Sequence, residues 1–306
     1  MELRNLTTMV EVARQGGFSQ AARALFSTQS TVSKAVRQLE EELGEALFIR
    51  SSDGARLTDA GEVVYARAAT ILAEAAHLKA EVAELQGLLT GRLRLGLPLL
   101  GSAKLFAPLF ATFRSRHPGV EIELLEQGSA QLEQAVMAGE VELAVSLLPV
   151  AEAFDWQAVC DDPLMALLHP DHPLRHRRTI RLAELAETPF ILFKNGFVLN
   201  PRIEEACRRL GFTPRVTARS SQMDFIVALA AAGLGVPLLP HVMVEGRRFA
   251  PLRAIRIDEP DLRWRAALIW RREARLSPAA RAWLALTRER FPSAPQPDPG
   301  ALSLHE

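Results

Sequence analysis

A chain of 306 residues exceeds the usual size of one compact domain, so we expect two or three units, each with its own core. The composition, 48% hydrophobic and 24% charged, excludes a disordered or fibrous protein, and because 36 basic and 36 acidic residues cancel, any surface that binds a polyanion must be local. No stretch is apolar over the roughly 18 residues that a membrane span needs, and the charged N-terminus is not a signal peptide, so we expect a cytoplasmic protein with no membrane contact.

The first 44 residues predict three short helices. Apolar residues recur at helical spacing over residues 3–13, and a pair of glycines then ends the pattern. Ser19 is expected to cap a second helix, residues 20–25, and after a tight connection a third helix continues to Gly44. Three helices with a brief turn between the last two form the plan of a helix-turn-helix.

A small hairpin follows the third helix. Two short apolar runs, residues 47–49 and 55–57, flank Asp53-Gly54, which is a strong turn signal for a hairpin. This hairpin would form a wing beside the three helices.

The next segment, from Thr58 to about Leu89, predicts one long helix. Its apolar residues alternate spacings of four and three, which is a heptad seam: Val64, Ala68, Ile71, Ala75, Leu78, Val82, Leu85 and Leu89. Such a helix is roughly 45 Å long, and its seam would be left in water unless a second helix covers it. We therefore expect a homodimer through this helix; packing on its own chain alone is the alternative.

Beyond Gly91, short β-like runs alternate with helical segments in two successive sets, which predicts two α/β lobes. Lobe I is expected to comprise residues 91–161 and 263–292, and lobe II residues 162–262, so that the chain crosses between the lobes twice. The proline-rich tail, residues 293–306, is expected to be disordered.

Positive charge is concentrated around the third helix. Between Val12 and Leu39 there are four basic residues and no acidic one, which marks the place where a nucleic acid would bind. In a helix-turn-helix the N-terminal part of the second helix of the motif enters the major groove, where Gln, Ser, Thr and Lys can bond base edges or phosphates. Double-stranded DNA is the predicted partner, and the predicted contacts are Thr28, Gln29, Ser30, Thr31, Ser33, Lys34 and Arg37, with Arg50 and Arg56 from the wing.

The same region resembles the LysR-type transcriptional regulators. The resemblance rests on Gly17-Phe18-Ser19, Ala21-Ala22, Leu25, Thr28-Gln29, Val32-Ser33, Leu39-Glu40, Leu43-Gly44, Leu47-Phe48, Arg50, Leu57-Thr58 and Ala60-Gly61. It implies an α+β multidomain fold: a winged helix-turn-helix (1–61), a linker and dimerisation helix (58–90), and an effector-binding domain (91–292) resembling type 2 periplasmic binding proteins. It also implies a sequence-specific regulator that assembles as a homodimer or homotetramer and responds to a small molecule bound between the lobes.

Two positions depart from the family pattern. Ser30 stands where the family often has proline, and it adds an N–H and a hydroxyl at the groove. Asp53 stands where the wing commonly carries a basic residue, so a minor-groove contact by the wing stays open, and Arg50 or Arg56 can supply it instead.

Ligands of two-lobed α/β proteins bind in the crevice where strand ends and helix N-termini meet. The predicted effector residues are therefore Leu99, Leu100, Gly101, Ser102, Gly128, Ser129 and Ser146 from lobe I, with Lys194, Phe197, Asn200, Ser221 and Gln222 from lobe II. Asn200 precedes a proline, so capping a helix is an equal alternative for it.

A finer resemblance concerns the segment 193–200, with Trp156 and residues 269–272. It is similar to the CidR-like branch of the family, which is associated with acetate and overflow metabolism. This suggests a small carboxylate effector, with which Lys194 can pair.

Other chemistry has weaker signals. The sequence contains no nucleophile elbow, phosphate loop or metal ligand set, and the prolines beside His169 and His172 favour a surface loop, so neither catalysis, cofactor nor metal is expected. Two alternatives stay open: a redox-responsive regulator that uses Cys160 and Cys207, and an α/β enzyme with a fused DNA-binding head.

Overall fold

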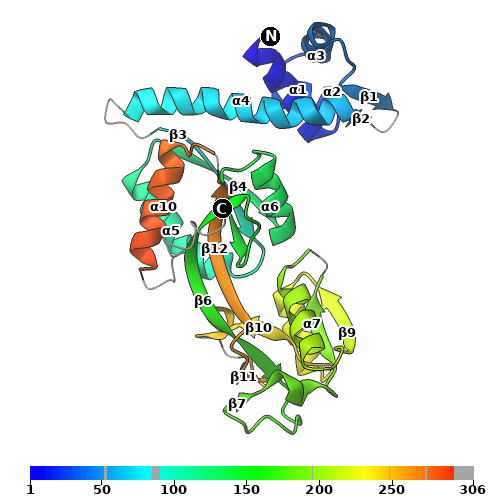
Figure 1. Ribbon diagram of the computed structural model, residues 1–306, viewed down its shortest axis with the longest axis vertical. Coiled ribbons are helices and arrows are strands. Elements are labelled where there is room, and N and C mark those ends of the chain that lie inside the picture. Colours follow the sequence, from blue (N-terminus) through cyan, green and yellow to red (C-terminus); the bar gives the residue numbers. More distant parts are fainter. Residues whose placement is uncertain (52–53, 85–89, 195, 248, 273, 293–306) are drawn as a thin grey trace, which may run out of the picture. The chain divides into compact units, whose positions relative to one another are not determined.

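The computed structural model describes residues 1–51, 54–84, 90–194, 196–247, 249–272 and 274–292. The chain divides into two compact units, Met1–Gly91 with Met137–Glu140, and Arg92–Val136 with Val141–Glu306 (Figure 1). Among the described residues, no helix is long and apolar enough to cross a membrane.

The first unit begins with three helices, α1 (Leu3–Gln15), α2 (Phe18–Ala24) and α3 (Gln29–Leu43). Helix α1 ends at Gly16 and α3 ends at Gly44, and both glycines adopt the left-handed conformation that closes a helix. Helix α2 starts earlier than predicted, and the predicted cap at Ser19 is wrong. Phe18 turns inward and packs its ring edge against Phe48, so the helix begins there, after Gly17.

The core of this unit is built from the inner stripes of the three helices. Met9, Val36 and Leu39 are completely buried there, as the helical periodicity predicts. Val64 and Ala68 of the following helix pack against the same cluster. The exposed face of α3 is therefore supported by a packed core.

The wing consists of β1 (Phe48–Ser51) and β2 (Gly54–Leu57), which pair antiparallel. Two hydrogen bonds fix its base: the Leu47 N–H donates to Glu40 Oε1 at 2.8 Å, and the Ala55 N–H donates to the Gly16 carbonyl at 2.9 Å. The wing is thus tied to the ends of both α3 and α1.

Helix α4 (Asp59–Glu84) follows the wing, and the predicted long helix is confirmed over these residues. Thr58 caps it, because its hydroxyl accepts from the Gly61 N–H at 2.9 Å. Gly61 is required at this junction, since a Cβ there would lie 2.1 Å from the Leu47 carbonyl oxygen.

The second unit contains two lobes. Lobe I has three helices beside its strands: β3 (Gly91–Pro98), α5 (Ser102–Arg116), β4 (Val120–Gln127), α6 (Ser129–Met137), β5 (Leu143–Leu147) and α10 (Pro278–Arg290). Strands β3 and β5 are parallel, whereas β12 (Arg263–Arg271) joins β5 antiparallel, so the sheet is mixed. Trp283 anchors α10 by packing against Phe110 and Phe113 of α5.

Lobe II contains β7 (Thr179–Ile180), a 3-10 turn η1 (Leu182–Leu185), β8 (Phe190–Phe193), α7 (Leu199–Arg209), β9 (Val216–Ser220), α8 (Met223–Ala231), β10 (Leu238–Pro240), α9 (His241–Val244) and β11 (Arg253–Ile257). Strands β8 and β9 are parallel. Helix α7 begins at Leu199, so Asn200 lies within its first turn, and the expected capping role of Asn200 is wrong.

The two lobes share a pair of long antiparallel strands, β6 (Phe154–Leu168) and β12, which Figure 1 shows passing from one lobe to the other. The first part of β6 pairs with β12, and its last residues pair with β10 and β11. The polar run Asp161-Asp162 and Pro163 interrupt the apolar pattern, but pairing with β12 holds the segment extended.

Candidate DNA-binding face and effector pocket

The N-terminal half of α3 has an exposed polar surface. The Thr28 hydroxyl accepts from the Thr31 N–H at 3.2 Å and so caps the helix. Gln29, Ser30 and Lys34 are exposed, while Ser33 is partly buried. This surface is preorganised, because the cap satisfies a backbone donor that water would otherwise have to satisfy.

Charge divides α3 along its length. Lys34 and Arg37 are exposed, and neither forms an ion pair with another described residue. The acidic residues Glu41 and Glu42 follow at the C-terminal end, where Glu42 pairs with the N-terminal amine at 3.1 Å. The helix therefore presents an uncharged to basic first half and an acidic last turn, which suits a polyanion at the first half only.

The wing contributes one basic side chain of known exposure. Arg56 of β2 is exposed and lies opposite Ile49 in the hairpin register. The side chain of Arg50 and the whole of Asp53 lie outside the described residues, so their predicted roles stay predictions.

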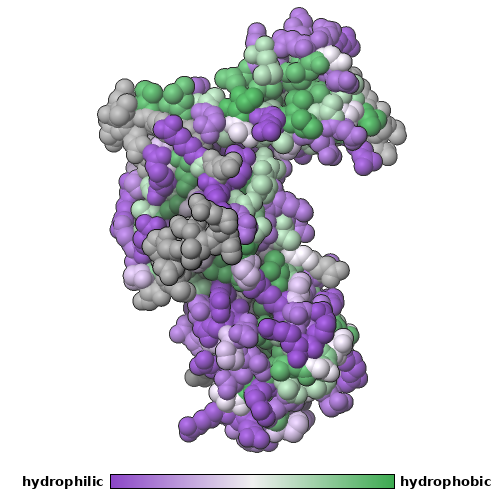
Figure 2. Space-filling model, in the orientation of Figure 1, coloured by the Kyte–Doolittle hydropathy of each residue, from purple (hydrophilic) through white to green (hydrophobic). Residues whose placement is uncertain are grey.

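The apolar seam of α4 divides into two parts. Val64 and Ala68 are taken up by the core of their own chain, as the alternative interpretation of the seam required. Ile71, Leu78 and Val82 remain exposed, Leu78 by 65%. Figure 2 shows hydrophobic residues at the surface over this unit. The later half of α4 thus carries an uncovered apolar stripe; Leu85 and Leu89 lie outside the described residues.

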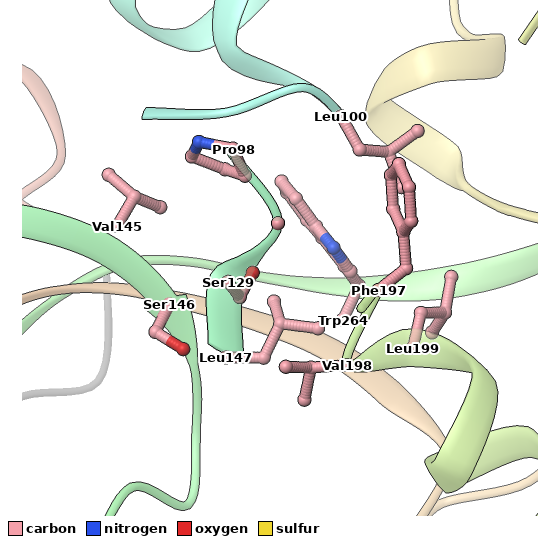
Figure 3. A pocket seen from close by; sticks show the side chains of 11 residues that line it. Pro98, Leu100, Ser129, Val145, Ser146, Leu147, Phe197, Val198, Leu199 and Trp264 are labelled. Carbon is pink, nitrogen blue, oxygen red and sulfur yellow. The ribbon is translucent and has the colours of Figure 1, made fainter. Parts of the chain in front are cut away.

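A pocket lies between the two lobes of the second unit (Figure 3), and in this arrangement its volume is about 20 Å³, which is room for one water molecule. Its walls come from the ends of β3 and β5, the start of α6, the loop before α7, and Trp264 of β12. Trp264 is only 2% exposed and lies among side chains of both lobes. The lining residues are Pro98, Leu100, Gly128, Ser129, Val145, Ser146, Leu147, Phe197, Val198, Leu199 and Trp264.

Arg202 of α7 bonds the backbone of Leu147, one of the residues that line this pocket. Its guanidinium donates to the carbonyl oxygens of Leu147 and Leu148, at 2.9 Å for Leu147. Burial lowers the pKa of Arg202, repulsion from Arg265 acts in the same direction, and Glu133 opposes both. A cation of lobe II therefore holds the strand end of lobe I.

Two further contacts connect the lobes. Lys104 of α5 pairs with Glu245, which follows α9, at 2.9 Å, and this hydrogen bond lowers the pKa of the Glu245 carboxyl. Gly128 and Gly196 also meet across the lobes, since a Cβ on Gly128 would lie 2.5 Å from the Gly196 carbonyl oxygen. The structure thus shows the lobes in a closed arrangement.

A second, more open pocket of about 370 Å³ adjoins the loop before α7. Phe197 and Val198 line both pockets. Arg219 and Glu204 line the second one and pair with each other at 2.8 Å. Its one lining cation is thus already neutralised.

Comparison with known families identifies both units. Residues 3–62 match the description "Bacterial regulatory helix-turn-helix protein, lysR family", and residues 86–292 match "LysR substrate binding domain". The chain belongs to the LysR family of transcriptional regulators. This LysR regulator is a DNA-binding protein with an effector-binding domain, and its α+β multidomain fold agrees with the prediction.

Individual relatives cover the LysR regulator along almost its whole length. It is 36% identical to the uncharacterized HTH-type transcriptional regulator YwbI of Bacillus subtilis, over 94% of this chain and 96% of that protein. It is 30% identical to the transcriptional dual regulator GltC of Bacillus subtilis, over 92% of this chain and 94% of that protein. Among solved structures, a full-length OxyR variant from Pseudomonas aeruginosa matches with a TM-score of 0.79 at 26% identity, covering 98% of this chain and 99% of that one.

The structure brings together some of the predicted effector residues of the LysR regulator. Leu100, Gly128, Ser129, Ser146 and Phe197 line the first pocket, and Phe197 and Asn200 line the second. The others line neither pocket: Leu99, Gly101, Ser102, Lys194, Ser221 and Gln222. The prediction omitted Val145, Leu199 and Trp264, because apolar residues of a strand or helix have no sequence signal that separates a pocket wall from a core.

Asn200 and Lys194 have other surroundings than expected. The Asn200 side chain accepts from the Phe193 N–H at 3.1 Å and donates to the Phe193 and Lys194 carbonyls, at 2.7 and 3.1 Å. It therefore braces the loop that carries Phe197. Lys194 itself is exposed.

The two cysteines of the LysR regulator lie on separate elements, Cys160 on β6 and Cys207 on α7. Burial raises the pKa of both thiols to about 12. Neutral thiols are poor nucleophiles, so this environment does not favour a redox role over effector binding.

Proposed function

We propose that the LysR regulator reads a promoter site through the first half of α3. The observation that carries the proposal is the exposed, acid-free surface of Gln29, Ser30 and Lys34, set on a capped helix in an otherwise neutral chain. Residues 1–61 act as the DNA-binding head, 58–90 as the linker and 91–292 as the effector domain.

The individual DNA contacts follow from side-chain chemistry. Gln29 pairs with an adenine edge, Ser33 and Thr31 bond bases or phosphates, and Lys34 meets guanine or phosphate. Arg37 and Arg56 contact the backbone. Thr28 acts mainly as the cap of α3, because its hydroxyl is already shared with Ser30 and Thr31, at 2.9 and 2.8 Å.

The experiment is a footprint of the upstream region of the chain's own genomic neighbourhood. Gln29→Ala should weaken binding by about 1–3 kcal/mol at one base pair, and Lys34→Ala should weaken it uniformly and reduce the salt slope by about 1. Lys79→Ala removes an exposed charge on α4 and is the matched control. Absence of protection at low salt, with candidate effectors present, would refute the proposal.

Two copies are proposed to pair through the exposed stripe of α4, and pairs can associate into a tetramer. Ile71, Leu78 and Val82 support this, because apolar side chains at near-heptad spacing are covered when two such helices pack together. Leu78→Asp should lower the mass in sedimentation, whereas Lys79→Asp, its neighbour, should not. An unchanged mass for Leu78→Asp would contradict pairing through α4.

The pocket between the lobes is proposed to bind the effector. Binding favours one arrangement of the lobes over another, and this changes how the two DNA-binding heads of the dimer are placed. The pocket offers binding and no chemistry, since none of its lining side chains titrates near neutral pH. We accordingly propose a cytoplasmic regulator without a catalytic step. The resemblance to the CidR-like branch, and the carboxylate effector it suggested, stay predictions.

A further inference from the structure

A second concentration of basic residues lies in lobe II. Residues 175–181 contain four arginines and one histidine and no acidic residue, although the chain as a whole is neutral. Two of these arginines, Arg177 and Arg178, come directly before β7, and both are exposed. On the neighbouring strand β11, Arg253 and Arg256 are exposed as well. Arg177, Arg178, Arg253 and Arg256 form what we call the arginine patch.

Strand pairing brings the arginine patch together. Strand β7 is the last strand of its sheet and pairs in parallel with β11, where Thr179 lies opposite Arg256. Neighbouring strands are about 5 Å apart, and each residue advances about 3.3 Å along a strand. The Cα atoms of Arg178 and Arg253 therefore lie within roughly 10 Å of the Cα atom of Arg256. Figure 1 shows β7 and β11 at the end of lobe II that is away from lobe I.

The protein itself does not neutralise the arginine patch. None of the four arginines forms an ion pair with another described residue. The acidic residues that follow β7 and β11 lie beyond the carboxyl ends of these parallel strands, whereas three of the four arginines lie at or before the amino ends. Two of these acidic residues are also engaged: Glu184 accepts from the Arg181 N–H at 2.9 Å, and Glu259 accepts from the Leu182 N–H at 3.0 Å.

Three other exposed arginines of this unit are each paired with a carboxylate of the chain. The pairs are Arg116 with Glu289, Arg208 with Glu205, and Arg209 with Asp261. The patch arginines have no such partner, so their charge and their guanidinium N–H donors are available to a molecule from outside. A guanidinium binds phosphate through two parallel hydrogen bonds, which makes a phosphate-bearing partner the best match.

The form of the surface favours a long partner over a small one. The patch arginines line neither of the two pockets described above, and they extend across the ends of two strands at the edge of a sheet. Such an open surface gives a small anion no enclosure, whereas a polyanion can meet several arginines at once and release counterions from each phosphate. Duplex DNA is the polyanion that a LysR regulator binds.

We infer that the arginine patch of lobe II is a second DNA-binding surface, which contacts the phosphate backbone of duplex DNA outside the base pairs read by α3. It adds affinity and no sequence preference, because phosphate contacts carry no base information. This inference goes beyond the proposed role of the head, since it assigns DNA contact to the effector-binding domain.

The test uses the full chain and a duplex of mixed sequence several helical turns long, so it does not depend on the promoter site. Binding is measured over a range of salt concentrations. The triple variant Arg177→Gln, Arg178→Gln, Arg256→Gln should reduce the slope of log K against log salt by about 2–3, roughly one per lost phosphate contact. Replacing the same three residues by lysine should keep most of the slope, because counterion release depends on charge.

The matched control is the triple variant Arg116→Gln, Arg208→Gln, Arg209→Gln. It removes the same charge from exposed arginines of the same unit, but these arginines are already paired with carboxylates. Its salt slope should equal that of the wild type. An unchanged slope for the patch variant, or an equal loss in the control variant, would overturn the inference. A patch variant that keeps its DNA slope but loses binding to poly-glutamate would overturn it too, and would assign the surface to an acidic protein.

The failure of this inference and the failure of the proposed reading by α3 give different results. Lys34→Ala should reduce the salt slope by about 1 in the wild type and also in the patch variant, because the two surfaces act separately. Loss of the Lys34 effect with the patch effect intact would remove the proposed role of α3 alone. The reverse result would remove the second surface alone.

Discussion

Arg202→Ala tests whether one side chain holds the two lobes together. The guanidinium donates two hydrogen bonds across the lobes to the carbonyls of Leu147 and Leu148, and a third, long one to the Pro149 carbonyl at 3.4 Å. Hydrogen bonds to a charged group contribute about 1.5–3 kcal/mol each. Because Arg202 is only partly buried, we take about 2–4 kcal/mol for the pair, which shifts the equilibrium between closed and open lobes by roughly 30- to 1000-fold.

The assay is acrylamide quenching of Trp264, a residue that closure hides almost completely from solvent. The chain has four tryptophans, so the Trp264 signal is isolated by subtracting the same measurement on Trp264→Phe. Arg202→Ala should strongly raise the quenching of Trp264. Arg202→Lys keeps the charge but cannot donate two parallel hydrogen bonds, so its quenching should lie between that of the wild type and that of Arg202→Ala.

The matched control is Arg208→Ala on the same helix, where Arg208 pairs with Glu205 of its own helix and not with lobe I. It should leave the quenching of Trp264 unchanged. If Arg202→Ala behaved like Arg208→Ala, the lobes would be held by other contacts, and the reasoning from the two hydrogen bonds would be refuted.

Three further outcomes are expected. Gly61→Ala should destabilise the head by about 1–3 kcal/mol in chemical denaturation and weaken DNA binding, because the new Cβ would lie 2.1 Å from the Leu47 carbonyl oxygen. An unchanged stability would show that the start of α4 can move away from Leu47 without cost. Thr28→Ala should cost about 1 kcal/mol in thermal unfolding through loss of the α3 cap, and an unchanged midpoint would argue against that cap. Cys160 and Cys207 should resist iodoacetamide in the folded protein at neutral pH, and peroxide should leave DNA binding unchanged; rapid labelling would favour the redox alternative.

The raised thiol pKa also has a consequence for stability, with a defined sign. An acid whose pKa is raised on folding binds its proton more tightly in the folded state. Its contribution is therefore fully present below the ordinary value of 9.0 and is lost as the pH rises towards about 12. Titrating from neutral to acid pH should show no effect from either cysteine.

Local periodicity was sufficient for the head of this protein. Apolar spacing placed α1 and α3, the Asp53-Gly54 signal placed the hairpin, and the acid-free stretch after Val12 is the basis on which the DNA-binding face is predicted. These features depend on residues a few positions apart, so a single sequence carries them. The start of α2 was missed because Phe18 is held by Phe48, a contact across thirty residues that periodicity does not contain.

Tertiary structure decided which residues line the proposed effector site and which residues of the α4 seam are covered by their own chain. Val64 and Ala68 pack against the core of their own chain and Leu78 is exposed, although all three fit one heptad pattern. Val145 and Trp264 line the pocket because β5 and β12 pass beside it, whereas Lys194, which follows β8, is exposed and lines neither pocket. The sequence determined which elements form in the head and where positive charge is concentrated, because those depend on local spacing and composition. Which side chains meet between the lobes depends on how distant strands pair, and only the folded chain decides that.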